Sequence, residues 1–189
     1  HAGYYPGATQ MTLKLLFNPA DGRIFGAQAV GCNGIDKRID VIAMAVHAGM
    51  TVYDLEEVEL CYAPQYGSAK DVVNMAGFVA AGVLRGDHPV VHLDDELTHS
   101  ELKDGMLLDV RTQQEFARGH LPSALNIPLE ILRENLSDLP RDQTIIAYCQ
   151  VGLRGYMATR LLQQNNFKVA NLSGGYRLFQ NSNQTKEKQ

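Results

Sequence analysis

The sequence lacks several features that would each mark a class of protein. Its 189 residues contain no tryptophan and only three cysteines, Cys32, Cys61 and Cys149, which lie far apart and form no Cys-x-x-Cys pair. This usage excludes a disulfide scaffold or a zinc knuckle and is typical of a reducing cytoplasm. The sequence also contains no Gly-x-Gly-x-x-Gly, so it has no dinucleotide-binding fingerprint.

Long apolar runs and an excess of positive charge are missing as well. No stretch approaches the roughly 18 apolar residues needed to span a bilayer, and no secretion signal opens the chain. Seventeen basic and 21 acidic residues give a net charge of −4, which predicts no general attraction to nucleic acid or anionic membranes. The composition, 45% hydrophobic and 20% charged, is that of an ordinary globular protein. We therefore expect a cytoplasmic protein that binds neither nucleic acid nor membrane.

The first part of the chain predicts an α+β domain built on an antiparallel hairpin. Two apolar runs, 11–17 and 23–31, flank a turn that ends in Asp21-Gly22. Asp-Gly between apolar runs is a strong hairpin signal. Helical spacing of apolar residues follows. Helices are expected over 36–47, from Thr51 onward for a short stretch, and over 68–84.

The pattern changes at Gly86-Asp87-His88-Pro89, where glycine and proline interrupt it. Beyond this point short apolar strands alternate with helical stretches, which predicts an α/β domain with a mostly parallel sheet and helices on both faces. Strands are expected over 90–93, 106–110, 124–126, 144–148 and 168–171, and helices over 95–103, 113–118, 130–135, 154–164 and 175–179. The sequence thus predicts two domains, 1–86 and 87–180, and a disordered polar tail over 181–189.

Cys149 follows a predicted buried strand and precedes a loop punctuated by glycine, in the stretch IIAYCQVGLRGY over 145–156. Backbone N–H groups of such a loop, the N-terminus of the next helix and Arg154 would converge on the thiol and favour the nucleophilic thiolate. A lone cysteine after a strand is commonly a small core residue, but this loop has no obvious packing role and favours a nucleophile. The loop consists of Gln150, Val151, Gly152, Leu153, Arg154 and Gly155.

Two segments of the second domain resemble the rhodanese family. They read LLDVRTQQEFARGHLPSALNIPL over 107–129 and CQVGLRG over 149–155, and the resemblance covers about 88–180. It implies that Cys149 takes sulfane sulfur from thiosulfate, polysulfide or a persulfide and passes it to a thiol acceptor. Arg154 and the loop amides would hold the sulfur or the donor anion. Asp109 and Arg111 would shape the pocket, or equally brace the loop as an ion pair, and His120 would be structural.

Two other functions compete with sulfur transfer for this loop. Cysteine phosphatases carry a similar loop with the motif Cys-x5-Arg. In this sequence only four residues separate Cys149 from Arg154, and Gly155 stands at the position of the phosphatase arginine. The smaller loop suits one sulfur atom better than a tetrahedral phosphate. A non-catalytic docking or regulatory module is the other alternative, and the cysteine itself argues against it. No metal site is expected.

Three motifs of the first domain, HAGYYPG (1–7), DKRIDV (36–41) and YAPQYGSAKD (62–71), resemble the dimerisation domain of flavin-dependent coenzyme A disulfide reductases and related NADH oxidases. The resemblance covers about 1–84 and implies a homodimer. In it, Tyr4 and Tyr62 would reach the partner's active site and give a proton or hydrogen bond to a departing thiolate. Packing at an interface is the alternative role for both tyrosines, and Tyr5 and Tyr66 are second choices.

The resemblance also implies a larger parent enzyme. The chain opens on His1 and lacks the FAD and NAD fingerprints, so we expect the C-terminal part of a flavoprotein that uses FAD, NAD(P)H and coenzyme A. That parent would reduce coenzyme A disulfide, a persulfide or polysulfide, while this chain alone would bind none of these cofactors in the family manner. Cys32 and Cys61 are predicted to be buried thiols. Three basic residues are assigned either to coenzyme A phosphates or to solvated surface: Lys37, Arg38 and Lys70.

Overall fold

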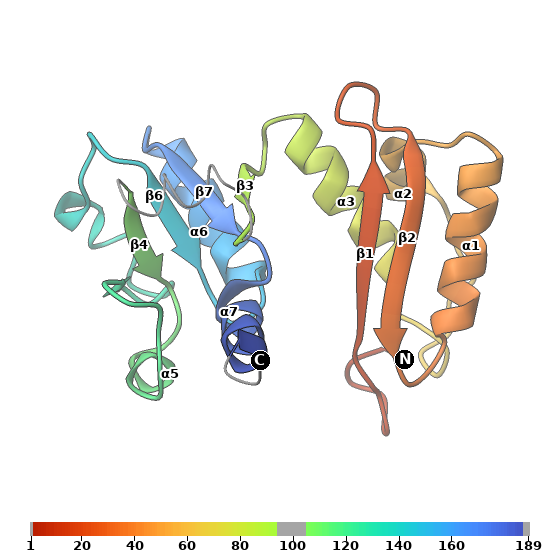
Figure 1. Ribbon diagram of the computed structural model, residues 1–189, viewed down its shortest axis with the longest axis horizontal. Coiled ribbons are helices and arrows are strands. Elements are labelled where there is room, and N and C mark those ends of the chain that lie inside the picture. The colour runs from red at the N-terminus through yellow and green to blue at the C-terminus, as the bar shows by residue number, and fades with distance from the viewer. Residues whose placement is uncertain (1, 94–104, 187–189) are drawn as a thin grey trace. The chain divides into compact units, whose positions relative to one another are not determined.

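The computed structural model describes residues 2–93 and 105–186 (Figure 1). The chain divides into two compact units, 1–86 and 87–189. The first unit holds a two-stranded antiparallel sheet with helices, and the second a five-stranded parallel sheet with helices. The fold class predicted from the sequence is therefore confirmed. In the described residues no helix is long and apolar enough to cross a membrane.

The first unit is organised around the hairpin of β1 (Met11–Phe17) and β2 (Ile24–Gly31). Burial alternates along β1, so that Leu13, Leu15 and Phe17 pack into the core while the residues between them face outward. The tight turn relies on Gly22, whose φ of 77° is accessible to glycine at little cost. The hairpin supplies one layer of the unit, and three helices supply the other.

The helices of the first unit are α1 (Ile35–His47), α2 (Val52–Glu57) and α3 (Val72–Leu84). Thr51 and Asp54 form a capping box at the start of α2. Asp71 caps α3, so this helix begins four residues later than the 68–84 stretch predicted. Gly77 lets α3 approach α2 closely, because a Cβ there would collide with the backbone of Glu56.

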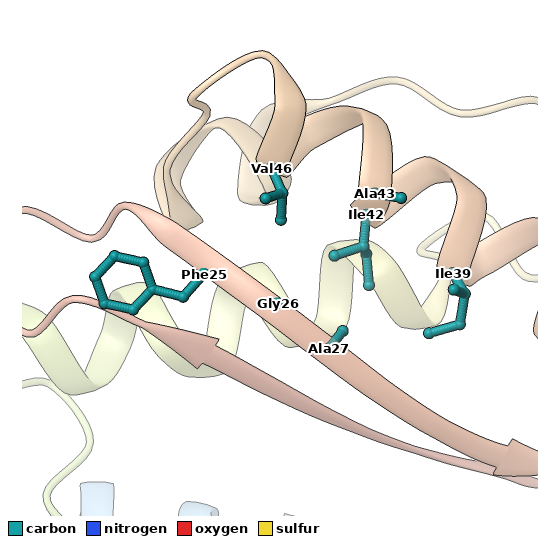
Figure 2. Close-up of a pocket in the computed structure, with 7 residues that line it drawn as sticks. All are labelled: Phe25, Gly26, Ala27, Ile39, Ile42, Ala43 and Val46. Carbon is teal, nitrogen blue, oxygen red and sulfur yellow. The ribbon is translucent and has the colours of Figure 1, made fainter.

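Helix α1 packs along β2, and Figure 2 shows a pocket between the two elements. All of its lining residues are apolar, and the pocket therefore offers no group for catalysis or for binding an anion or metal. We interpret it as incomplete packing between a strand and a helix. It is lined by Phe25, Gly26, Ala27, Ile39, Ile42, Ala43 and Val46.

In the second unit the strands are arranged in the order β3-β7-β6-β4-β5, and all of their pairings are parallel. Helices α6 and α7 pack into different apolar clusters, α6 with Leu108 and Ile145 and α7 with Ile146 and Tyr148. Because neighbouring strand residues point to opposite faces, these helices cover opposite faces of the sheet. The strands are β3 (Val90–Val91), β4 (Met106–Asp109), β5 (Leu125–Asn126), β6 (Ile145–Tyr148) and β7 (Val169–Leu172). The helices are α5 (Gln113–Ala117), α6 (Leu153–Gln164) and α7 (Gly175–Lys186), with a 3₁₀ turn η1 (Leu136–Asp138).

Two helices of the second unit differ from the sequence predictions. Over 130–135 the chain forms turns instead of an α-helix, because successive N–H groups bond the carbonyl three residues back. Helix α7 continues to Lys186, six residues into the 181–189 segment expected to be disordered. Its first turns are anchored by Tyr176 and Phe179, and polar residues can extend a helix that is anchored in this way. The helix predicted over 95–103 lies outside the described residues.

Candidate functional site

Cys149 lies at the carboxyl end of the central strand β6, directly before the loop that leads into α6. The backbone N–H of Gly152 donates a hydrogen bond to the Cys149 Sγ at 3.1 Å. Gly152 precedes α6 with φ 137°, a conformation that side chains disfavour. The positive end of the α6 dipole therefore lies beside the sulfur and would stabilise negative charge there.

The N-terminus of α7 holds the backbone of the same loop. The N–H groups of Tyr176 and Arg177 donate to the carbonyl oxygens of Cys149 and Gln150 at 2.9 and 3.0 Å. Gly175 has φ 54°, and a Cβ at this position would collide with the Cys149 carbonyl oxygen. The loop is thus fixed between α6 and α7.

Arg154, in the first turn of α6, forms a bidentate ion pair with Glu115. Both hydrogen bonds measure 2.7 Å, and both side chains are 29% exposed. The hydrogen bonds from Arg154 lower the pKa of Glu115 to about 2, so the carboxylate stays ionised at physiological pH. Hydrogen bonding to Glu115 is also the main cause that raises the pKa of Arg154, with a smaller contribution from Cys149. The side-chain hydrogen bonds of Arg154 are therefore made to Glu115.

Asp109 and Arg111 form a buried ion pair behind the loop. Two of the Arg111 nitrogens donate to the Asp109 carboxylate, at distances from 2.6 to 3.0 Å. Arg111 also donates to the Gly119 carbonyl and, at 3.2 Å, to the side-chain oxygen of Gln150. Burial opposes the charge of Arg111, but the hydrogen bonds to Asp109 outweigh it and raise its pKa. The pair thus braces the loop through Gln150, with Arg111 over the ring of Tyr176.

Asn171 on β7 contacts the loop from the other side and was not anticipated from the sequence. Its Nδ2 donates to the His88 Nε2 at 2.9 Å and to the Gly152 carbonyl at 3.3 Å. Gly155 approaches so closely that any side chain there would collide with Asn171. The Oδ1 atom of Asn171 has no hydrogen-bond partner in the described part of the chain. The sequence offered one signal for this contact, namely a polar asparagine within an apolar stretch that was predicted to form a buried strand.

His88 should make the stability of the second unit depend on pH. Burial is the main cause that lowers its pKa below 6.5, and Arg160 adds to the effect. As the pH falls below about 6.5, the unfolded chain takes up a proton that the folded state resists, so stability is lost. We expect the wild-type melting temperature to drop from pH 7.5 to pH 5.5 by more than that of His88→Gln, whose amide oxygen can still accept from Asn171. Equal drops in the two proteins would contradict the assignment.

Tyr4 and Tyr62 meet on the surface of the first unit, although 58 positions separate them. Their hydroxyl oxygens lie 3.1 Å apart. The hydrogen bond with Tyr4 is the main cause that raises the pKa of Tyr62. The Ala2 N–H donates to the Pro64 carbonyl and ties the two aromatic motifs together. Both side chains are exposed, as are those of Tyr5 and Tyr66, so they are available to another molecule.

Known protein families account for both units. Residues 93–182 match the rhodanese-like domain, and residues 1–71 match the pyridine nucleotide-disulphide oxidoreductase dimerisation domain. The chain joins a dimerisation domain of these oxidoreductases to a rhodanese-like domain. Both resemblances noted in the sequence are therefore confirmed.

Two solved structures match nearly all of this chain within longer chains. CoADR-RHD from Bacillus anthracis, solved in its reduced form, is 46% identical with a TM-score of 0.90, over 95% of this chain and 32% of that one. A NAD-dependent persulfide reductase from A. fulgidus is 39% identical with a TM-score of 0.80, over 92% and 31%. Coenzyme A disulfide reductase from Staphylococcus haemolyticus is 48% identical over 80 residues, which are 42% of this chain and 18% of that protein. The chain thus spans a third or less of these relatives.

The structure corrects three expectations about the dimerisation domain. Cys32 and Cys61 were expected to be buried, but both are exposed, because they lie where the chain leaves regular structure. Arg38 was assigned to coenzyme A or to solvent, yet it is buried and paired with Asp71 at 2.6 Å. Its other nitrogen donates to the Gly34 carbonyl, so Arg38 fixes the entry to α1.

The two lysines considered for coenzyme A lie at the surface, whereas His120 packs against a neighbouring side chain. Lys37 and Lys70 are exposed, and the Lys70 ammonium lies 5.4 Å from the centre of the Phe78 ring. In the rhodanese-like domain, His120 stacks on Phe116 at 3.8 Å and contacts the carbonyl of the same residue. His120 thus has local packing partners on α5.

Proposed function

We propose that the rhodanese-like domain carries sulfane sulfur on Cys149 as a persulfide and transfers it to a thiol acceptor. The observation that supports this function best is the Gly152 N–H aimed at the Cys149 Sγ from the N-terminal end of α6. A persulfide anion at this point would meet the same amide and helix dipole. Asp109 and Arg111 would keep the loop in this conformation through Gln150.

The proposed transfer conserves atoms and electrons. The Cys149 thiolate attacks the terminal sulfur of a persulfide R–S–SH, the S–S bond of the donor breaks, and RS⁻ leaves with the bonding pair. Cys149 then carries –S–SH. An acceptor thiolate attacks the outer sulfur, a new persulfide forms on the acceptor, and the Cys149 thiolate is restored. The exchange requires no external oxidant or reductant.

We further propose that the two domains act within a longer reductase of coenzyme A disulfide, persulfide or polysulfide. The names of the relatives support this proposal. FAD and NAD(P)H would bind to other domains, since no dinucleotide fingerprint occurs in these 189 residues. Two chains would associate through the dimerisation domain, and Tyr4 and Tyr62 would donate a hydrogen bond to the thiolate released from coenzyme A. The exposed pair of hydroxyl groups at 3.1 Å supports that role.

The transfer is tested by measuring thiocyanate formed from polysulfide and cyanide, above the uncatalysed background. We expect wild type to turn over and Cys149→Ser to lose at least about 10³-fold of the activity. A variant carrying both Cys32→Ser and Cys61→Ser is the control, because these thiols are exposed and could react without catalysis. Equal activity of Cys149→Ser and wild type would contradict the proposal.

Burial of Cys149 is also consistent with one competing function. The Cys149 residue is only 1% exposed, as expected for a core cysteine of a non-catalytic docking module and equally for a nucleophile that is shielded from solvent. In a docking module, sulfur transfer would be absent from wild type while a partner still bound. The thiocyanate assay therefore separates the two functions.

A further inference from the structure

Carboxylates engage two arginines of the Cys149 site, Arg154 and Arg111. Glu115 holds Arg154 with two hydrogen bonds of 2.7 Å, and Asp109 holds Arg111 in the buried pair behind the loop. A free guanidinium would attract the two negative charges of thiosulfate. An arginine already engaged by a carboxylate has little attraction left for a second anion.

A second acidic group influences Arg154, and the loop that leads to it exposes apolar side chains. The exposed carboxylate of Glu130 also helps to raise the pKa of Arg154, so a second acidic group acts on this cation. Val151 and Leu153, on either side of Gly152, are 54% and 65% exposed. The rim of the loop is therefore suited to an organic group rather than to a sulfonate.

We propose that Glu115 is a specificity-determining residue that makes the Cys149 site favour organic persulfides over thiosulfate. This inference rests on the proposed sulfur transfer. With thiosulfate, the Cys149 thiolate attacks the outer sulfur, the S–S bond breaks and sulfite leaves with the bonding pair. That leaving group keeps two negative charges near the carboxylate of Glu115. With an organic persulfide the leaving group is a thiolate with one charge and an apolar stem that Val151 and Leu153 can contact.

The capping geometry allows the charge of Glu115 to be removed with little damage to the fold. Glu115 accepts a hydrogen bond from the Thr112 N–H and completes the capping box of α5. Glutamine also serves at this position of a capping box, so Glu115→Gln can keep the cap while it loses the charge and one of the two hydrogen bonds from Arg154. Thr112→Ala is the matched control, because it weakens the cap and keeps the carboxylate.

The experiment compares kcat/KM for thiosulfate with kcat/KM for the persulfide of 2-mercaptoethanol, using the full chain and cyanide as the acceptor. We expect Glu115→Gln to raise the ratio of thiosulfate to persulfide by about tenfold, because Arg154 becomes free to bind the sulfonate end. Thr112→Ala should leave the ratio unchanged. Melting curves show whether each variant is folded.

The outcomes separate the inference from the function on which it rests. If wild type and Glu115→Gln use both donors with the same ratio, the role of Glu115 is overturned while sulfur transfer stands. If wild type turns over neither donor, both proposals fail. If Glu115→Gln does not fold, the inference is tested instead by the salt dependence of the thiosulfate to persulfide ratio of wild type. Added salt should raise the thiosulfate to persulfide ratio if the carboxylates repel the dianion, and a fall in the ratio would overturn the inference.

Discussion

Replacing Asp109 with asparagine should destabilise the rhodanese-like domain by about 3–5 kcal/mol. The Arg111 side chain is 2% exposed and that of Asp109 is fully buried. Without the carboxylate, a guanidinium charge would remain in the interior with neutral partners only. Urea unfolding, followed by circular dichroism and compared with wild type, measures the loss.

The matched control is an ion pair of the same domain at the surface. Asp87 and Arg160 lie 3.4 Å apart with side chains that are 48% and 38% exposed. Solvent screens such a pair, so Asp87→Asn should change stability by at most about 1 kcal/mol. If Asp109→Asn costs no more than Asp87→Asn, the buried pair does not brace the domain as the structure indicates.

Replacing Gly175 with alanine should both destabilise the domain, by about 2–4 kcal/mol, and impair sulfur transfer. The new Cβ would strain a residue at φ 54° and collide with the Cys149 carbonyl oxygen. The chain must then shift at the point where Tyr176 anchors the loop. Urea unfolding and the thiocyanate assay measure the two effects.

Gly49→Ala separates backbone strain from the collision. Gly49 has a similar φ of 71°, but a Cβ there would meet no atom within 4 Å. Strain alone should cost the dimerisation domain about 1 kcal/mol. A Gly175→Ala variant that loses no more stability than Gly49→Ala, and still transfers sulfur at the wild-type rate, would contradict the described role of α7.

Local signals in the sequence were sufficient to predict most of the elements. The Asp21-Gly22 turn lies between strands that do pair, and Thr51 does begin a capped helix. The strand, loop and helix around Cys149 were also predictable, because an apolar run, a glycine-punctuated loop and a helical pattern follow one another there. Each of these signals depends on residues close together in the chain.

Contacts between distant residues could not be predicted in the same way. The sequence predicts that Arg38 is a solvated or ligand-binding charge. Its actual partner, Asp71, lies 33 positions away and could not be identified from the local pattern. Asn171 and His88 are 83 positions apart, and nothing local indicates that one would hold the other. The engagement of Arg154 by Glu115 likewise depends on how α5 and α6 are placed by the sheet.

The central claim, that Cys149 carries the sulfane sulfur, is tested most directly by mass spectrometry. The chain is incubated with polysulfide, desalted and analysed intact, and then digested to locate the added mass. We predict a gain of one sulfur atom on the peptide that contains Cys149, retained in the variant with both Cys32→Ser and Cys61→Ser and absent from Cys149→Ser. A gain that persists in Cys149→Ser, or that is confined to the exposed Cys32 and Cys61, would contradict the account.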